Sequence, residues 1–145
     1  MDSWVLLSIL AAFFFAFSAV AVKMLVSPGH ENAGIGSSAL LFLLGAGIVL
    51  VGFAAWQGLS NFPTGNSLVY ALASGILWGF GMVVSLMAYK GGAAIARVAP
   101  IVNSNTLIIV IIGIFLLNET PSLDQMARVA FGALLILVGG ALLII

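Results

Sequence analysis

The chain has 145 residues, of which 63% are apolar and 6% are charged, and its formal net charge is zero. Soluble domains carry about 25% charged residues, so this chain cannot cover a water-exposed surface, and lipid must be its solvent. The few basic residues exclude a nucleic-acid footprint, and the absence of cysteine excludes disulfides, thiolate metal sites and a cysteine nucleophile.

Apolar blocks divide the chain, each close to the roughly 20 residues that a helix needs to cross a bilayer. There are five, over residues 4–26, 39–56, 68–89, 94–117 and 124–145, separated by short connectors. Their apolar residues occupy all sides, without the alternation of a barrel strand. The sequence therefore predicts an all-α, multi-pass protein of the cell (inner) membrane, with one five-helix domain over residues 1–145.

The first block has an alternative interpretation as a signal peptide. Its first three residues lack Lys and Arg and its apolar run is long, so we expect a retained helix. Lys23 lies near the end of this block, as Arg97 lies near the start of the fourth. These two side chains either snorkel to the lipid headgroups or attract an anionic group of a substrate at the mouth of a cavity.

The third block carries the sequence Gly75-Ile-Leu-Trp-Gly79 near its middle. Two glycines one turn apart allow another helix backbone to approach closely, either within the chain or in a dimer. Trp78 lies near the block centre, where its indole either packs in the bundle or stacks on an apolar or cationic substrate. Three aromatic residues lie near block ends and are expected to anchor the chain at the membrane interface, namely Trp4, Trp56 and Tyr89.

The fourth block is the most informative, because consecutive polar residues lie at its middle, shortly after Pro100. Spaced by about 100° on a helix, their side chains cannot all avoid lipid unless the helix is enclosed or is opened beside a polar cavity. Pro100 removes one backbone donor and loosens the turn before it. We interpret Asn103, Ser104, Asn105 and Thr106 as candidate substrate-binding residues. The alternative is that they hydrogen-bond neighbouring helices.

Several kinds of chemistry are missing from the apolar blocks. The acidic residues Asp2, Glu31, Glu119 and Asp124 are all terminal or in connectors, so no intramembrane carboxylate can relay protons. Walker loops, nucleophile elbows and clusters of metal ligands are also absent. The sequence predicts that the protein is not an enzyme and holds no metal and no cofactor.

The odd number of blocks places the two termini on opposite sides of the membrane. Lys23, Lys90 and Arg97 fall on one side, whereas Arg128 and the terminal amine fall on the other, which is a small bias under the positive-inside rule. Such a bias is compatible with insertion in both orientations, and two copies of opposite orientation would form inverted repeats. We therefore expect an antiparallel homodimer.

The last connector and the fifth block carry a family pattern. Glu119-Thr-Pro121, followed by Gln125 and the Gly-rich segment 132–139, resembles the junction of helices four and five in EamA-like proteins of the drug/metabolite transporter superfamily. Asn118 stands where that family usually has Gly, which is a small departure. Physically, the Glu119 side chain can cap the last helix by satisfying its free amides.

The segment Arg97-Val-Ala-Pro100 is also similar to the fourth helix of that family, and the five-helix plan covers the whole chain. The resemblance implies a single five-helix repeat. Larger relatives fuse two inverted copies around a central cavity and export or exchange metabolites or toxic compounds. Because substrate-selecting residues vary in the family, the resemblance implies no particular substrate.

Taken together, these patterns predict a secondary transporter for a small molecule in the lipid bilayer, working by alternating access as an antiparallel homodimer. Pro100, Glu119, Gly75 and Gly79 have structural roles in this interpretation. The alternative is a membrane assembly subunit that does not transport and uses the polar turn only for helix association. A pore would need a ring of charges or a continuous polar lining, and neither is readable in the sequence.

Overall fold

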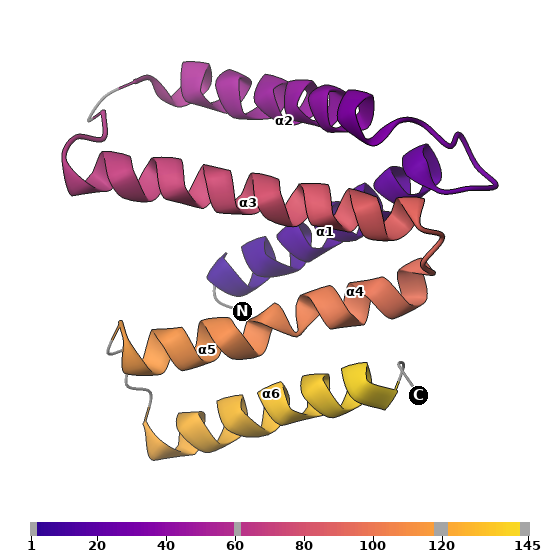
Figure 1. Ribbon diagram of the computed structural model, residues 1–145. Helices are drawn as coiled ribbons and strands as arrows, with labels where there is room; N and C mark the ends of the chain where they lie inside the picture. Colours follow the sequence, from indigo (N-terminus) through magenta and orange to yellow (C-terminus); the bar gives the residue numbers. More distant parts are fainter. Residues whose placement is uncertain (1–2, 60–61, 118–121, 143–145) are drawn as a thin grey trace. The chain divides into compact units, whose positions relative to one another are not determined.

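The computed structural model describes residues 3–59, 62–117 and 122–142, and these residues form helices joined by turns (Figure 1). In chain order the helices are α1 (Ser3–Val26), α2 (Ile35–Gln57), α3 (Asn66–Lys90), α4 (Ile95–Asn103), α5 (Asn105–Phe115) and α6 (Leu123–Leu142). The predicted all-α class is confirmed. Within these ranges, five helical stretches are long and apolar enough to cross a membrane, with α4 and α5 together making the fourth.

The largest differences from the predicted boundaries concern the second and fourth blocks. Helix α2 begins at Ile35 rather than at residue 39, after Gly34 in an extended conformation (φ −67°, ψ 141°). The Ser37 hydroxyl donates a hydrogen bond to the Gly34 carbonyl at 3.0 Å, so the polar start of the helix is stabilised locally. The fourth block is two helices instead of one, because the chain leaves the α-helical pattern at Ser104.

Two compact units make up the chain, residues 1–92 and residues 93–145. In the N-terminal unit α1 and α2 both pack against α3, and α2 runs antiparallel beside α3 (Figure 1). Within the described part of this unit, the buried residues gather at one end. They come from the last turns of α1 and α3 and from the start of α2, and they are Val22, Val26, Ser27, Ser38, Leu86 and Tyr89.

The aromatic residues expected at the membrane interface behave differently from each other. Trp56 is 77% exposed at the end of α2, as an interface anchor should be. Tyr89 is only 4% exposed, and the Lys23 ammonium lies 5.9 Å from the centre of its ring. The expectation for Tyr89 is therefore wrong, because its ring belongs to the packed end of the unit and takes part in a cation–π contact.

Two serines at this packed end have buried side chains without a hydrogen-bond partner. The hydroxyls of Ser27, just after α1, and Ser38, in the first turn of α2, make no hydrogen bond within the described residues. Each residue is only 1% exposed. A buried hydroxyl without a partner lowers stability, so the helices must pack well enough here to offset that cost.

In the C-terminal unit α4 and α5 pack along α6, which runs antiparallel to them (Figure 1). Small residues lie at this contact, where Gly113, Ala133 and Gly140 are buried. A Cβ atom at Gly140 would lie 3.7 Å from the Pro100 carbonyl oxygen, so α6 passes close to the backbone of α4. Close backbone approach at small residues is typical of helix packing in membranes.

Helix α6 begins with a reciprocal pair of hydrogen bonds. The Ser122 N–H donates to Gln125 Oε1 at 3.1 Å, and the Gln125 N–H donates to the Ser122 hydroxyl at 3.4 Å. This arrangement is a capping box with Gln at its third position. The capping residue in the structure is therefore Ser122. Glu119, for which a capping role is expected, lies outside the described residues.

Candidate substrate-binding site

The fourth span is interrupted where its polar residues lie. Pro100 has no backbone N–H, so the Ala96 carbonyl loses its usual helical donor. The Ser104 N–H donates to both the Pro100 and Ile101 carbonyls, at 3.1 and 3.2 Å, and the Leu107 N–H donates to the Ser104 carbonyl at 3.1 Å. Bonds of the i to i−3 type define a short 3₁₀ turn, so α4 and α5 meet at a turn rather than in a continuous helix.

The polar side chains of this turn are accessible. Asn103, Asn105 and Thr106 are exposed and Ser104 is half-buried. The Ser104 hydroxyl donates back to the Ile101 carbonyl, which satisfies it locally. Among the described residues, the side chains of Asn103, Asn105 and Thr106 form no hydrogen bond. Their donors and acceptors are therefore not used to hold α4 or α5 against α6.

Trp78, the second candidate, lies in an apolar groove between α2 and α3. The groove has a volume of about 330 Å³, and Gly79 and Met82 are among the residues that line it. The Trp78 and Phe42 rings lie 5.3 Å apart, centre to centre, with their planes tilted by 34°. Trp78 is 50% exposed, so its indole both packs on Phe42 and keeps a free face.

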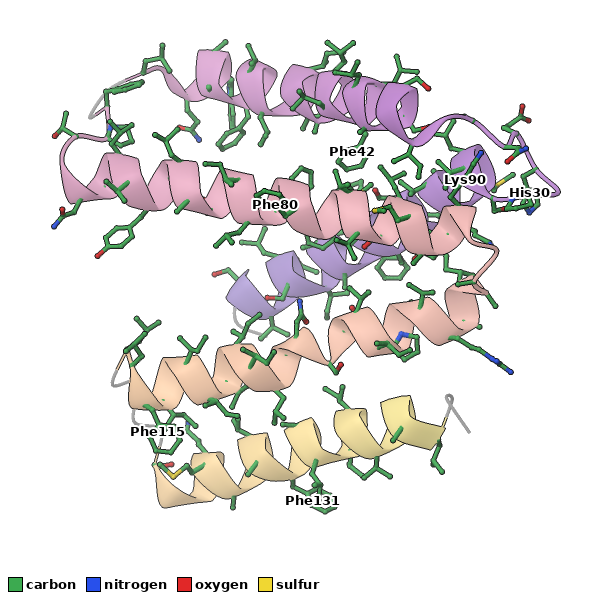
Figure 2. All side chains as sticks on the ribbon, viewed as in Figure 1. His30, Phe42, Phe80, Lys90, Phe115 and Phe131 are labelled. Atoms are coloured by element: carbon green, nitrogen blue, oxygen red, sulfur yellow. The ribbon has the colours of Figure 1, made fainter. Side chains whose placement is uncertain are left out.

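Phe42 is a candidate that the sequence did not predict. It contacts Trp78 from α2, and Figure 2 shows it on α2 and Phe80 on the neighbouring α3. Phe42 is one of 10 phenylalanines in uniformly apolar blocks, and nothing in its neighbourhood distinguishes it from the others. Only the pairing of α2 with α3 identifies it.

A second groove, of about 240 Å³, lies between α5 and α6. Its lining is apolar, with Leu107, Phe115 and Met126 among its members. A groove without donors or acceptors cannot orient a polar substrate, so the polar turn is the better candidate for that role.

The two charges expected at a cavity mouth lie in different settings. Lys23 is half-buried at the end of α1 and lies over the Tyr89 ring. Arg97 is exposed in the first turn of α4. Lys23 therefore contributes to packing, whereas the guanidinium of Arg97 is accessible to an anion or a headgroup.

The glycine pair of α3 has open space beside it. A Cβ atom at Gly75 or Gly79 would meet no atom within 4 Å in the described part of the protein. Among the described residues of the N-terminal unit, no second helix therefore makes the close approach that such a pair permits. Gly79 instead lines the groove that holds Trp78.

The structure brings Pro100 and the residues from Asn103 to Thr106 together at one turn of the C-terminal unit, whereas Trp78 and Lys23 belong to the N-terminal unit. A shared site of Trp78 and the polar turn stays a prediction. In the part of the chain that the structure describes, no group of His, Asp or Glu residues could hold a metal ion. The available chemistry is neutral hydrogen bonding and aromatic stacking.

Five apolar spans with polar groups at the centre of the fourth define a multi-pass integral membrane protein of the kind that moves small molecules. The EamA-like transporter family matches residues 2–145, so the chain belongs to that family, and the resemblance seen in the sequence is confirmed. The family and the names of the relatives indicate a transporter.

The relatives fall into two size classes. A Sinorhizobium sp protein named "Uncharacterized transporter in cobO 3'region" is 30% identical over 140 residues, which cover 94% of this chain and 98% of the relative. Proteins of Staphylococcus aureus strains COL and N315, each named "Putative ribose uptake protein RbsU", are 29% identical over 126 residues. This match covers 86% of the chain but only 40% of those relatives. No solved structure matches the chain.

Proposed function

We propose that the protein is a secondary transporter that works by alternating access as an antiparallel homodimer, with the polar turn of the fourth span in its substrate site. One observation carries this proposal. The fourth span is broken by a 3₁₀ turn at Ser104, and the neighbouring side chains of Asn103, Asn105 and Thr106 are left without partners in the described residues. Broken helices that line a cavity at mid-membrane are typical of transporter sites.

The depth of the turn supports the proposal. The fourth span, Ile95–Phe115, has 21 residues. At a rise of about 1.5 Å per residue it is roughly 30 Å long, the thickness of the hydrocarbon core. Asn103 and Asn105 lie near its middle, where water is absent and an unpaired amide is costly. A polar substrate would satisfy these amides.

The sizes of the relatives support a dimer. The Sinorhizobium protein has nearly the same length as the matched region, whereas the chain spans only 40% of the Staphylococcus relatives. In a long protein a second repeat can complete the cavity. We infer that in this protein a second copy of opposite orientation does so, which the odd number of spans and the small charge bias permit.

The chemistry of the site favours a small neutral metabolite. Asn and Thr supply donors and acceptors without a fixed charge, and Trp78 and Phe42 offer aromatic faces. A pentose is the first compound to test, because relatives at 29% identity are named for ribose uptake.

Flux into proteoliposomes tests the proposal. Purified protein should accumulate labelled ribose or another small neutral metabolite, and Asn103→Leu and Asn105→Leu should each lower the flux about tenfold, as expected when one hydrogen bond to the substrate is lost. Asn66→Leu is the matched control, because it makes the same chemical change at the exposed start of α3. Normal flux in both Asn variants would assign the polar turn to helix association.

Labelling of introduced cysteines tests the dimer. The chain has no cysteine of its own, so His30→Cys in the α1–α2 loop gives a single reporter. In an antiparallel homodimer, a membrane-impermeant thiol reagent should label about half of the molecules from each side. Labelling from one side only would exclude this assembly. A stable dimer that shows no flux with any compound would favour the assembly subunit instead.

A further inference from the structure

Lys90, the last residue of α3, is held by the loop that joins α1 to α2. Its ammonium donates hydrogen bonds to the Asn32 carbonyl at 2.7 Å, to Asn32 Oδ1 at 2.7 Å and to the Ala33 carbonyl at 2.9 Å. Figure 2 shows Lys90 beside the part of this loop that carries His30. An ammonium has three protons to donate, and here all of them have an acceptor. The hydrogen-bonding capacity of the Lys90 ammonium is thus fully used without an acidic partner.

The loop is shaped to present these oxygens. Asn32 adopts a left-handed backbone conformation with φ 52°, which Asn tolerates better than most residues. The Glu31 N–H donates to the Met24 carbonyl at 3.2 Å, and the Ala33 N–H donates to the Leu25 carbonyl at 2.9 Å. The loop therefore caps the carbonyl end of α1 with its N–H groups while its own oxygens face Lys90.

The same end of the unit is fastened by packing. Leu86 and Val26 are fully buried there, and the Lys23 ammonium lies over the Tyr89 ring. At the opposite ends of α2 and α3, no described residue is buried. Phe53 near the end of α2 and Val69 near the start of α3 are 57% and 61% exposed.

We propose that Lys90 and residues 31–33 form a latch that holds α1, α2 and α3 together at one membrane face, while the opposite ends of α2 and α3 remain free to separate. Charge-assisted hydrogen bonds are roughly twice as strong as neutral ones, so the Lys90 side chain alone can make one end of these helices more firmly held than the other. The latch is a property of the folded chain and does not depend on the transport activity. If the protein transports as proposed above, the latched end is the pivot about which the free ends open and close.

Hydrogen exchange in lipid nanodiscs tests the latch. Lys90→Met keeps the length of the side chain and removes all donors, so the amides of Glu31 and Ala33 should exchange at least about tenfold faster. Asn32→Gly removes only the Oδ1 acceptor and keeps the left-handed backbone, so a smaller increase is expected. Arg97→Met is the matched control, because it removes one positive charge outside the latch.

An unchanged rate in Lys90→Met would overturn the proposal, as would an equal increase in Arg97→Met, since the effect would then be one of net charge. If Lys90→Met does not fold, the exchange rates of the Glu31 and Ala33 amides in Asn32→Gly and Lys90→Arg test the latch instead. Transport is not needed for this measurement, so a failed latch and a failed transport assay are distinguishable.

Spin-label distances test the second half of the proposal. Cysteines at His30 and Met87 bracket the latch, and cysteines at Phe53 and Val69 mark the opposite ends of α2 and α3. The latch pair should give one narrow distance distribution and the opposite pair a broad one. The latch pair should broaden in Lys90→Met. If the two distance distributions are equally wide in protein that keeps Lys90, the unit is not fastened at one end only and the proposal is refuted.

Discussion

Replacing Pro100 with Ala should make the fourth span a more continuous helix, stabilise the protein and slow its transport. The change restores an N–H that can donate to the Ala96 carbonyl, a bond worth about 0.5–1.5 kcal/mol. Pro costs up to about 3 kcal/mol relative to Ala inside a regular helix, and Pro100 lies inside α4. We therefore expect the free energy of unfolding to rise by about 1–2 kcal/mol.

The variant leaves the neighbouring contacts in place. The carbonyl of residue 100 still accepts the Ser104 N–H and still faces Gly140, so α6 need not move. Thermal unfolding in detergent measures the gain in stability. Flux into proteoliposomes should fall at least about tenfold if the interruption at Ser104 is needed for the transport cycle. Pro63→Ala, in the exposed α2–α3 connector, is the matched control.

Two results would refute this reasoning. Normal flux in a stabilised Pro100→Ala protein would show that the interruption of the fourth span plays no part in transport. A destabilised variant would show that Pro100 contributes packing that outweighs its missing N–H. The distance between spin labels at Arg97 on α4 and Ile111 on α5 reports whether the two helices have become continuous.

Further substitutions probe three other features. Ser122→Ala should lower the free energy of unfolding by about 1 kcal/mol in thermal melts, because it removes the cap of α6, and an unchanged melt would contradict the capping box. Gly75→Val should leave the protomer within about 1 kcal/mol of its stability, since its side chain meets open space, but should weaken dimers in cross-linking if α3 is a seam. Trp78→Ala and Phe42→Ala should each weaken substrate binding about threefold to tenfold in calorimetry, whereas Phe131→Ala on α6 should not.

The number and class of the helices could be predicted because both follow from composition. A run of about 20 apolar residues with almost no charge has one stable form in lipid, the helix, whatever the neighbours are. Even the broken fourth helix had a local signal, since Pro100 removes a donor and the polar residues after it favour an opened turn. These effects act within one span.

Features that depend on contacts between spans could not be predicted. Phe42 and Tyr89 are ordinary aromatic residues in sequence, and their roles appear only once α2 and α1 are placed against α3. From the sequence, Lys90 is only a positive charge at one membrane face, yet its three hydrogen-bond acceptors come from a loop 57 and 58 residues earlier.

The cap of α6 follows a known local motif, but the nearby Glu119 was a competing candidate for the capping residue.

The unpaired hydroxyls of Ser27 and Ser38 have a practical consequence for obtaining an experimental structure. Alanine at these positions removes a buried group that has lost its hydration and gained no partner among the described residues. The energy recovered at each site is about 1–3 kcal/mol, minus the small cavity that the missing oxygen leaves. Most substitutions shorten the life of a membrane protein in detergent, whereas this pair should lengthen it. A double alanine variant is thus a rational starting point for crystallisation or cryogenic imaging, with every candidate substrate contact left as it is.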